Sequence, residues 1–214
     1  MSEFIKSFVR RGRKLSKAKA DLRDELLPKL AIDLNNLSSK NAKINLEIGF
    51  GDGRFLSNIA IKKPDEIFLG CEPYMQGVVS LLEDINLHKI ENIFIWNDDA
   101  RLLIEKMPDN FLSKTFILFP DPWPKAKHNK RRIINKGLLD LLAEKMIDKG
   151  ELYIATDHED YHVWIMEVLS NHPKFHLEAG YDWQAEFGGV DTSYKDKALR
   201  KNISSHFMKS KLIK

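Results

Sequence analysis

The stretch Ile44-Asn-Leu-Glu-Ile-Gly-Phe-Gly-Asp-Gly53 decides the fold of this chain. Residues 44–48 form an apolar run of strand length, and the glycines that follow predict a loop. Residues 54–62 carry apolar side chains at helical spacing, so we expect a helix after the loop. A strand that leads into a helix through a glycine-rich loop is typical of a doubly wound α/β sheet.

The same alternation of strands and helices continues along the chain. Further strands are predicted at 67–71, 93–96, 115–119 and 152–155, and further helices at 75–87, 100–106, 133–146 and 160–170. Elements of these lengths predict a mostly parallel sheet with helices on both faces. Weaker patterns at 175–181 and 203–208 could complete the sheet as a late hairpin. Residues 1–40 are basic and then amphipathic, and we expect them to form an extension with a helix.

Composition narrows the class of protein. The chain has 214 residues, of which 43% are hydrophobic, enough for the core of one domain. No apolar window is long enough to span a membrane, and residues 1–13 lack the apolar segment of a secretory signal. Cys71 is the only cysteine, which excludes an internal disulfide and a multi-cysteine metal site. We therefore expect a cytoplasmic protein that does not associate with membranes.

Basic side chains are concentrated in the segments 10–19, 121–136 and 195–214. Together these hold 19 of the 34 lysines and arginines and only two of the 31 acids, so the rest of the chain is acidic. If the three segments meet in space, they form a surface that follows a phosphate backbone. The alternative is three separate solvated faces.

The glycine loop has the spacing G-x-G-x-G, at Gly49, Gly51 and Gly53. Glycine lets the backbone approach a ligand closely. The dinucleotide fingerprint needs its third glycine three positions after the second, whereas here it follows two positions after. Glu47 stands two residues before the first glycine. A carboxylate there tolerates the sulfonium and ammonium of S-adenosylmethionine better than a pyrophosphate, so the motif favours that cofactor over NAD.

Acids also follow the other predicted strands. Glu72 stands where an acid accepts hydrogen bonds from both hydroxyls of an adenosine ribose. Asp99 is placed to accept from an adenine amino group, although Asp98 competes for that role and either could cap the next helix. Asp121 and Asp157 follow the fourth and fifth strands. Because ligands of such sheets bind beyond the carboxyl ends of the strands, we expect one site there.

Residues 119–132 read Phe-Pro-Asp-Pro-Trp-Pro-Lys-Ala-Lys-His-Asn-Lys-Arg-Arg. The prolines on both sides of Asp121 fix φ and hold this acid at a stiff chain exit. A carboxylate can accept from the N1–H and N2–H groups of guanine, while lysines and arginines beside it neutralise phosphates. Trp123 could stack on a base or anchor the core, and the core is favoured. The alternative is that residues 119–132 have no binding role and form a proline-rich turn followed by the solvent-exposed start of a helix.

His158-Glu-Asp-Tyr-His162 matches the H-E-x-x-H pattern of zinc hydrolases. That motif needs both histidines on one helix face. Here the pattern straddles a predicted helix start, and no clear third ligand follows, although Glu178 and Glu186 exist. We therefore predict no metal and place the two histidines at the rim of the site.

With these motifs in place, the chain resembles the bacterial tRNA (guanine-N7-)-methyltransferase family nearly end to end. The resemblance rests on Ser7-Phe-Val-Arg-Arg-Gly-Arg-Lys-Leu-Ser16, the segment 47–53, Phe68-Leu-Gly-Cys-Glu72, Asp99-Ala100, Phe119-Pro-Asp-Pro-Trp123 with 125–132, and Ala155-Thr-Asp157. It implies a Rossmann-like methyltransferase domain with a seven-stranded sheet over residues 41–214. It also implies S-adenosylmethionine as methyl donor and a variable-loop guanosine at position 46 of tRNA as acceptor. We expect no obligate protein partner.

The resemblance also implies roles for single residues. Glu47, Gly49, Gly51, Gly53, Glu72 and Asp99 would bind the cofactor, Asp121 would be the catalytic and base-binding acid, Lys125, Asp157 and Thr192 would contact the substrate, and Lys127, His128, Asn129, Lys130, Arg131 and Arg132 would contact RNA. The chain departs from the family at Lys195, where the family has Glu, and this lysine would contact a phosphate instead. Two rival functions are a tRNA-binding module without catalysis and the zinc hydrolase.

Overall fold

The computed structural model describes residues 4–8, 14–38, 42–178, 183–187 and 204–214. The elements, with η for 3-10 helices, are α1 (Lys17–Leu26), η1 (Leu27–Leu30), α2 (Leu34–Ser38), β1 (Ile44–Ile48), α3 (Arg54–Lys62), β2 (Ile67–Cys71), α4 (Met75–His88), β3 (Ile93–Trp96), α5 (Ala100–Ile104), β4 (Leu112–Leu118), η2 (Ala126–Arg131), α6 (Lys136–Lys145), β5 (Met146–Thr156), α7 (Glu159–Ser170), β6 (Phe175–Leu177), η3 (Trp183–Phe187) and β7 (His206–Leu212). Within these ranges, no helix has the length and apolar character that crossing a bilayer requires.

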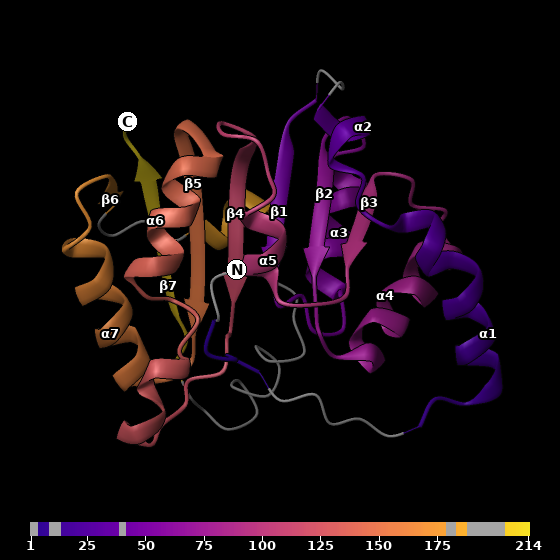
Figure 1. Ribbon diagram of the computed structural model, residues 1–214, viewed down its shortest axis with the longest axis horizontal. Helices are drawn as coiled ribbons and strands as arrows, with labels where there is room; N and C mark the ends of the chain where they lie inside the picture. Colours follow the sequence, from indigo (N-terminus) through magenta and orange to yellow (C-terminus); the bar gives the residue numbers. More distant parts are fainter. Residues whose placement is uncertain (1–3, 9–13, 39–41, 179–182, 188–203) are drawn as a thin grey trace.

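The described strands form one seven-stranded sheet in the order β3-β2-β1-β4-β5-β7-β6. Strands β1 to β5 pair in parallel, and β7 runs antiparallel to both β5 and β6. The prediction of a mostly parallel sheet completed by a late antiparallel pair is confirmed. The carboxyl ends of the parallel strands share one edge, the lower edge in Figure 1.

Several elements begin elsewhere than predicted. The helix expected over 133–146 begins only at Lys136, because the side chain of Asn135 caps it by accepting the Leu138 N–H at 3.1 Å. Met146, expected to end that helix, instead begins β5 and pairs with Leu112 of β4. Both strands therefore extend further toward their amino ends than their central apolar runs indicated.

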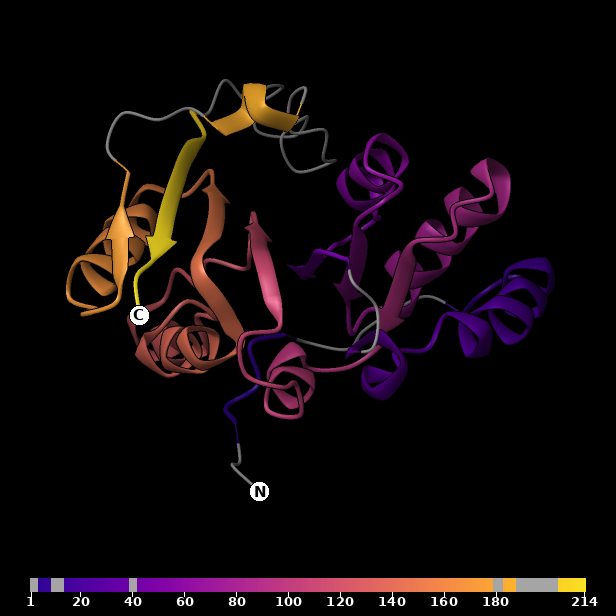
Figure 2. The ribbon, with the colours of Figure 1, turned by 90° about the horizontal axis from the view of Figure 1, so that it is seen from above.

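Helices cover both faces of the sheet, as predicted. One core cluster contains buried side chains from α5, α6 and α7, including Leu103, Leu138 and Ile165. The other cluster lies under α3, α4 and η3 and includes Phe187. Figure 2 shows η3 and α3 on one side of the sheet and α5 and α6 on the other. The helix expected in the N-terminal extension is α1, which packs against α4 through contacts that include the ion pair of Lys19 with Glu83.

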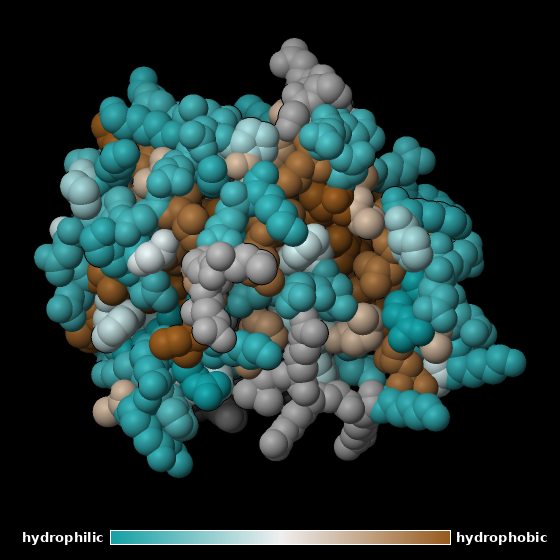
Figure 3. All heavy atoms as spheres, viewed as in Figure 1, coloured by the Kyte–Doolittle hydropathy of each residue, from teal (hydrophilic) through white to brown (hydrophobic). Residues whose placement is uncertain are grey.

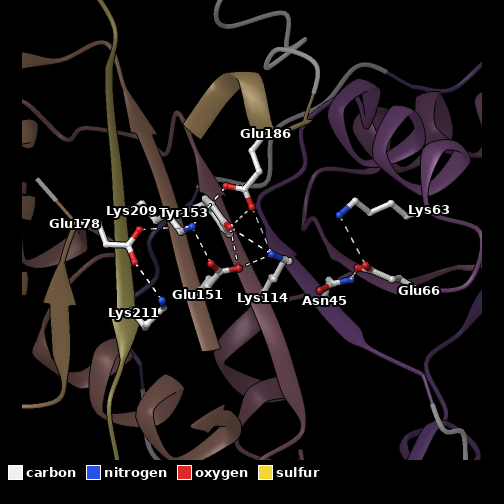
Figure 4. A network of polar contacts seen from close by, with 10 residues as sticks. All are labelled: Asn45, Lys63, Glu66, Lys114, Glu151, Tyr153, Glu178, Glu186, Lys209 and Lys211. Atoms are coloured by element: carbon white, nitrogen blue, oxygen red, sulfur yellow. Dashed lines mark hydrogen bonds and ion pairs between the residues drawn. The ribbon is translucent and has the colours of Figure 1, made fainter. Parts of the chain in front are cut away.

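A polar network fixes η3 to the sheet (Figure 4). The Tyr153 hydroxyl donates to Glu186 of η3 at 2.8 Å, and Lys114 bridges Glu151 and Glu186. Lys209 of β7 pairs with Glu151 at 2.7 Å. Burial alone would raise the pKa of Glu151, but the hydrogen bonds from Lys114 and Lys209 lower it to about 2. Glu151 therefore stays ionised at neutral pH, and the network holds η3 against the sheet.

Candidate active site

A cavity of about 340 Å³ lies at the carboxyl edge of the sheet. Its wall includes Gly49 and Gly51 from the loop after β1, Glu72 after β2, Asp99 after β3 and Asp121 after β4. Four of the five predicted strand ends thus contribute to one cavity, whereas Asp157, after β5, does not line it. This is the position at which doubly wound sheets bind their ligands.

The glycine loop adopts a backbone that ordinary side chains disfavour. Gly51 has φ +59°, and its N–H donates to the Glu72 carboxylate at 2.9 Å. Gly77, in the first turn of α4, packs directly against this loop: a Cβ atom there would lie 2.0 Å from the Gly51 carbonyl oxygen. Sequence reasoning missed Gly77, since it lies within a helical pattern and no local motif marks it.

Two acids belong to the strand ends at the glycine loop: Glu72 lies on the cavity wall, whereas Glu47 is not among the residues that line the cavity. Glu47 is only 2% exposed, and its Oε2 has no hydrogen-bond partner within the described residues. Burial, and then the nearby Glu72 and Asp52, raise the pKa of Glu47 to about 8. Burial also raises the pKa of Glu72, although the backbone N–H groups of Tyr74 and Gly51 oppose the shift. A buried acid with an unsatisfied oxygen is suited to a cationic ligand group.

The structure distinguishes the two candidate acids after β3. Asp99 caps α5 by accepting the Arg101 N–H at 3.1 Å, and its two oxygens also accept from the Arg101 guanidinium at 2.9 and 2.6 Å. The capping alternative therefore applies to Asp99. Asp98 lines the same cavity. Contact of either acid with an adenine amino group stays a prediction.

Asp121 projects from a strained segment that continues β4. Phe119 and Trp123, on either side of it, have φ +50° and +46°, values that non-glycine residues adopt rarely. The Phe119 N–H donates to Ala155 of β5 at 2.8 Å, which fixes the segment to the sheet. The Asp121 side chain reaches solvent, yet the surrounding protein displaces enough water to raise its pKa. Backbone strain of this kind is concentrated at functional sites.

Trp123 links the basic run to the N-terminal segment 4–8. Its indole N–H donates to the Ser7 carbonyl at 3.1 Å, and Ser7 itself lines the cavity. The guanidinium of Arg131 lies 4.9 Å from the Trp123 ring, and His128 meets the ring edge-on. Trp123 is only half-buried. The prediction of a core position was therefore wrong, because the ring serves as a platform for neighbouring groups at the surface.

The basic run forms an exposed face beside the cavity. Lys125, Lys127 and Lys130 are exposed, while His128 and Asn129 are half-buried. Hydrophilic side chains cover this region, at the lower left of the space-filling view in Figure 3. These positions are compatible with the predicted RNA contacts.

Arg132 requires a correction. It is 2% exposed, donates to the Pro122 carbonyl at 2.9 Å and pairs with Asp160. Its guanidinium also lies over the rings of Tyr161 and Trp164, at 5.0 and 5.2 Å. The prediction that Arg132 contacts RNA is wrong, because its donors are turned inward to hold the segment that carries Asp121.

The remaining predicted residues lie on the β5 side of the site or outside the described residues. Asp157 directly follows β5, beside the strand that leads to Asp121. Thr192 and Lys195 lie outside the described residues.

His158, the first residue of the H-E-x-x-H pattern, caps α7, its Nδ1 accepting the Tyr161 N–H at 3.3 Å. The prediction that H-E-x-x-H straddles a helix start is thus confirmed.

The fold and the cavity define a Rossmann-like methyltransferase: a parallel sheet of this order, a glycine loop after β1 and an acid after β2. A family model described as a putative methyltransferase matches residues 41–208. A tRNA (guanine-N(7)-)-methyltransferase of Wolbachia pipientis wMel is 47% identical over 77% of this chain and 74% of its own length. One of Zymomonas mobilis is 37% identical over 89% and 86%. The chain belongs to this methyltransferase family, which confirms the resemblance seen in its sequence.

Solved structures support the fold. An antibiotic-related methyltransferase superposes with a TM-score of 0.61 over 87% of this chain and 98% of its own. Its sequence identity is 16%, so the likeness concerns the arrangement of helices and strands alone.

Proposed function

We propose that this chain is an S-adenosylmethionine-dependent tRNA (guanine-N7-)-methyltransferase that acts on the variable-loop guanosine at position 46. The observation that carries the proposal is the position of Asp121. It lies on the wall of the cavity that contains Glu72 and the glycine loop, four residues before the exposed basic run that begins at Lys125. One carboxylate thus lies on the wall of the cavity and is followed closely in sequence by a surface suited to phosphates.

The residues that line the cavity, together with the buried Glu47, suit S-adenosylmethionine. Glu72 would accept hydrogen bonds from the ribose hydroxyls, and the unsatisfied oxygen of Glu47 would attract the ammonium group. Gly49 and Gly51 leave room for the cofactor to approach the backbone. Asp99 or Asp98 would meet the adenine amino group. Bound there, the cofactor supplies an electrophilic methyl group.

The chemistry of the acceptor explains why the site needs no strong base. Guanine N7 carries a free lone pair at neutral pH, so its methylation requires no proton removal. The rate depends on aligning N7 with the methyl group, which binding can provide. Positive charge moves onto the purine as the bond forms. Asp121, accepting from the N1–H and N2–H groups of the base, would stabilise that charge.

The basic face would hold the RNA backbone without reading its sequence. Lys125, Lys127 and Lys130 are exposed there, and Arg131 is oriented by its contact with Trp123. Asp157, Thr192 and Lys195 would also contact the tRNA substrate. Arg132 would act indirectly, by fixing Pro122 next to Asp121.

Methyl transfer to defined RNA tests the proposal. The purified chain is incubated with labelled S-adenosylmethionine and an unmodified tRNA transcript, with a transcript carrying adenosine at position 46 as matched control. Guanine methylated at N7 is labile to reduction and aniline scission, so cleavage maps the modified position. We expect label only in the first transcript and cleavage at position 46. No label in either transcript, or equal label in both, would contradict the proposal.

A further inference from the structure

Three potential metal ligands meet at the carboxyl end of β5. Glu159 and His162 lie in the first turns of α7, and His206 is the first residue of β7, where it pairs with Thr156. One ligand atom from each of the three side chains lies within 4.8 Å of the others. His206 Nε2 is 2.9 Å from one Glu159 oxygen, and His162 Nδ1 is 3.8 Å from the other.

The two imidazoles are arranged side by side. The rings are stacked face to face, with centroids 4.0 Å apart and planes that differ by 8°. One nitrogen of each ring lies near a Glu159 oxygen. His162 Nδ1 is buried and has no hydrogen-bond partner among the described residues. Glu159 is 74% exposed, so an ion can reach the group from solvent.

We propose that Glu159, His162 and His206 bind a divalent transition-metal ion of the zinc class, in place of the sequence-based expectation of no metal. Two imidazole nitrogens and one carboxylate oxygen are typical zinc ligands, whereas magnesium and calcium prefer oxygen ligands alone. The site differs from the zinc-hydrolase motif in its members. His158 is engaged as the cap of α7, Glu159 is a ligand and not a general base, and the third ligand comes from a distant strand.

Such an ion connects two parts of the chain that are far apart in sequence. It links the start of α7, two residues after Asp157, to the start of β7. Metal binding to the folded chain alone stabilises it through mass action, so the ion acts as a clamp on this edge of the sheet. None of the three ligands is among the residues proposed for methyl transfer.

Calorimetric titration tests the site without RNA, which would itself bind cations. The metal-stripped full chain is titrated with zinc chloride and, separately, with magnesium chloride, and its melting temperature is measured with and without zinc. We expect one zinc per chain, a higher melting temperature with zinc, and no comparable binding of magnesium. Cobalt(II) in place of zinc is expected to give visible absorption bands of a nitrogen-containing site.

Three variants identify the ligands. His162→Gln and His206→Gln should each weaken zinc binding at least about tenfold while melting normally without metal. His158→Asn is the matched control, because Asn preserves the helix cap, and it should bind zinc normally. Absence of zinc binding, or binding unaffected by both His162→Gln and His206→Gln, would overturn the proposal. Failure of His158→Asn to bind zinc would do so as well, in favour of the hydrolase pairing.

Discussion

The N–H of Gly51 and the carboxylate of Glu72 are joined by a hydrogen bond of 2.9 Å, which ties the loop after β1 to the acid after β2. Neither residue can be displaced without disturbing the other. Both residues line the cavity, and Glu47, one strand residue before the loop, is buried. The loop after β1 and the ends of β1 and β2 thus form the proposed cofactor pocket together.

Gly77 should be as important for cofactor binding as the loop itself. In Gly77→Ala the new methyl group would lie 2.0 Å from the Gly51 carbonyl oxygen, so the loop must move. We expect S-adenosylmethionine affinity to fall at least about tenfold by calorimetry. Gly137→Ala in α6 is the matched control, because its methyl group would meet only the Asn135 side chain, at 3.3 Å. Equal affinities in the two variants would refute this role of Gly77.

Cofactor binding should release a proton from Glu47. The free acid has its pKa raised to about 8 and is mostly neutral below that pH, whereas the cofactor ammonium favours the ionised form. Affinity should therefore fall as pH drops from 8 to 6. Calorimetry in buffers of different ionisation enthalpy should detect up to about one proton released per cofactor bound. Glu47→Gln should abolish this release; a wild-type chain that releases none would contradict the assignment.

The exposed lysines of the basic run should contribute to tRNA affinity through charge alone. Replacing Lys127 and Lys130 with alanine should flatten the plot of log affinity against log salt by roughly 0.7–0.9 for each phosphate that is no longer neutralised. Lys29→Ala, an exposed lysine on η1, should leave the slope unchanged. If the double variant also kept the wild-type slope, this run would be only a solvated face.

Arg132 should behave differently from these lysines. Its removal eliminates the bond to Pro122 and the packing against Tyr161 and Trp164. We expect Arg132→Ala to lower the free energy of unfolding by roughly 1–3 kcal/mol in a denaturant titration. Lys127→Ala, by contrast, should unfold like the wild type. A fully stable Arg132→Ala that binds tRNA weakly would instead support a direct contact between Arg132 and RNA.

The sequence predicted those features that depend on neighbouring residues. The spacing of apolar residues indicated the parallel sheet, and the prolines beside Asp121 indicated a constrained segment that the backbone angles of Phe119 and Trp123 bear out. Features that depend on distant contacts were missed. The burial of Arg132 requires α7, and the proximity of His206 to His162 requires β7 to pair with β5. No local sequence pattern predicts these contacts, because they form only when distant strands pair in the sheet and the helices pack on it.

Turnover of Asp121→Asn on tRNA probes the proposed mechanism at its centre. Asn preserves the shape of the side chain but offers an NH₂ group in place of one acceptor oxygen and carries no charge. We expect a normal melting temperature, normal S-adenosylmethionine binding and a fall in turnover of about 10²-fold or more, the scale expected when one electrostatic stabiliser is removed. Near wild-type turnover by this variant would show that Asp121 only shapes the turn after β4, and that the proposed mechanism is wrong.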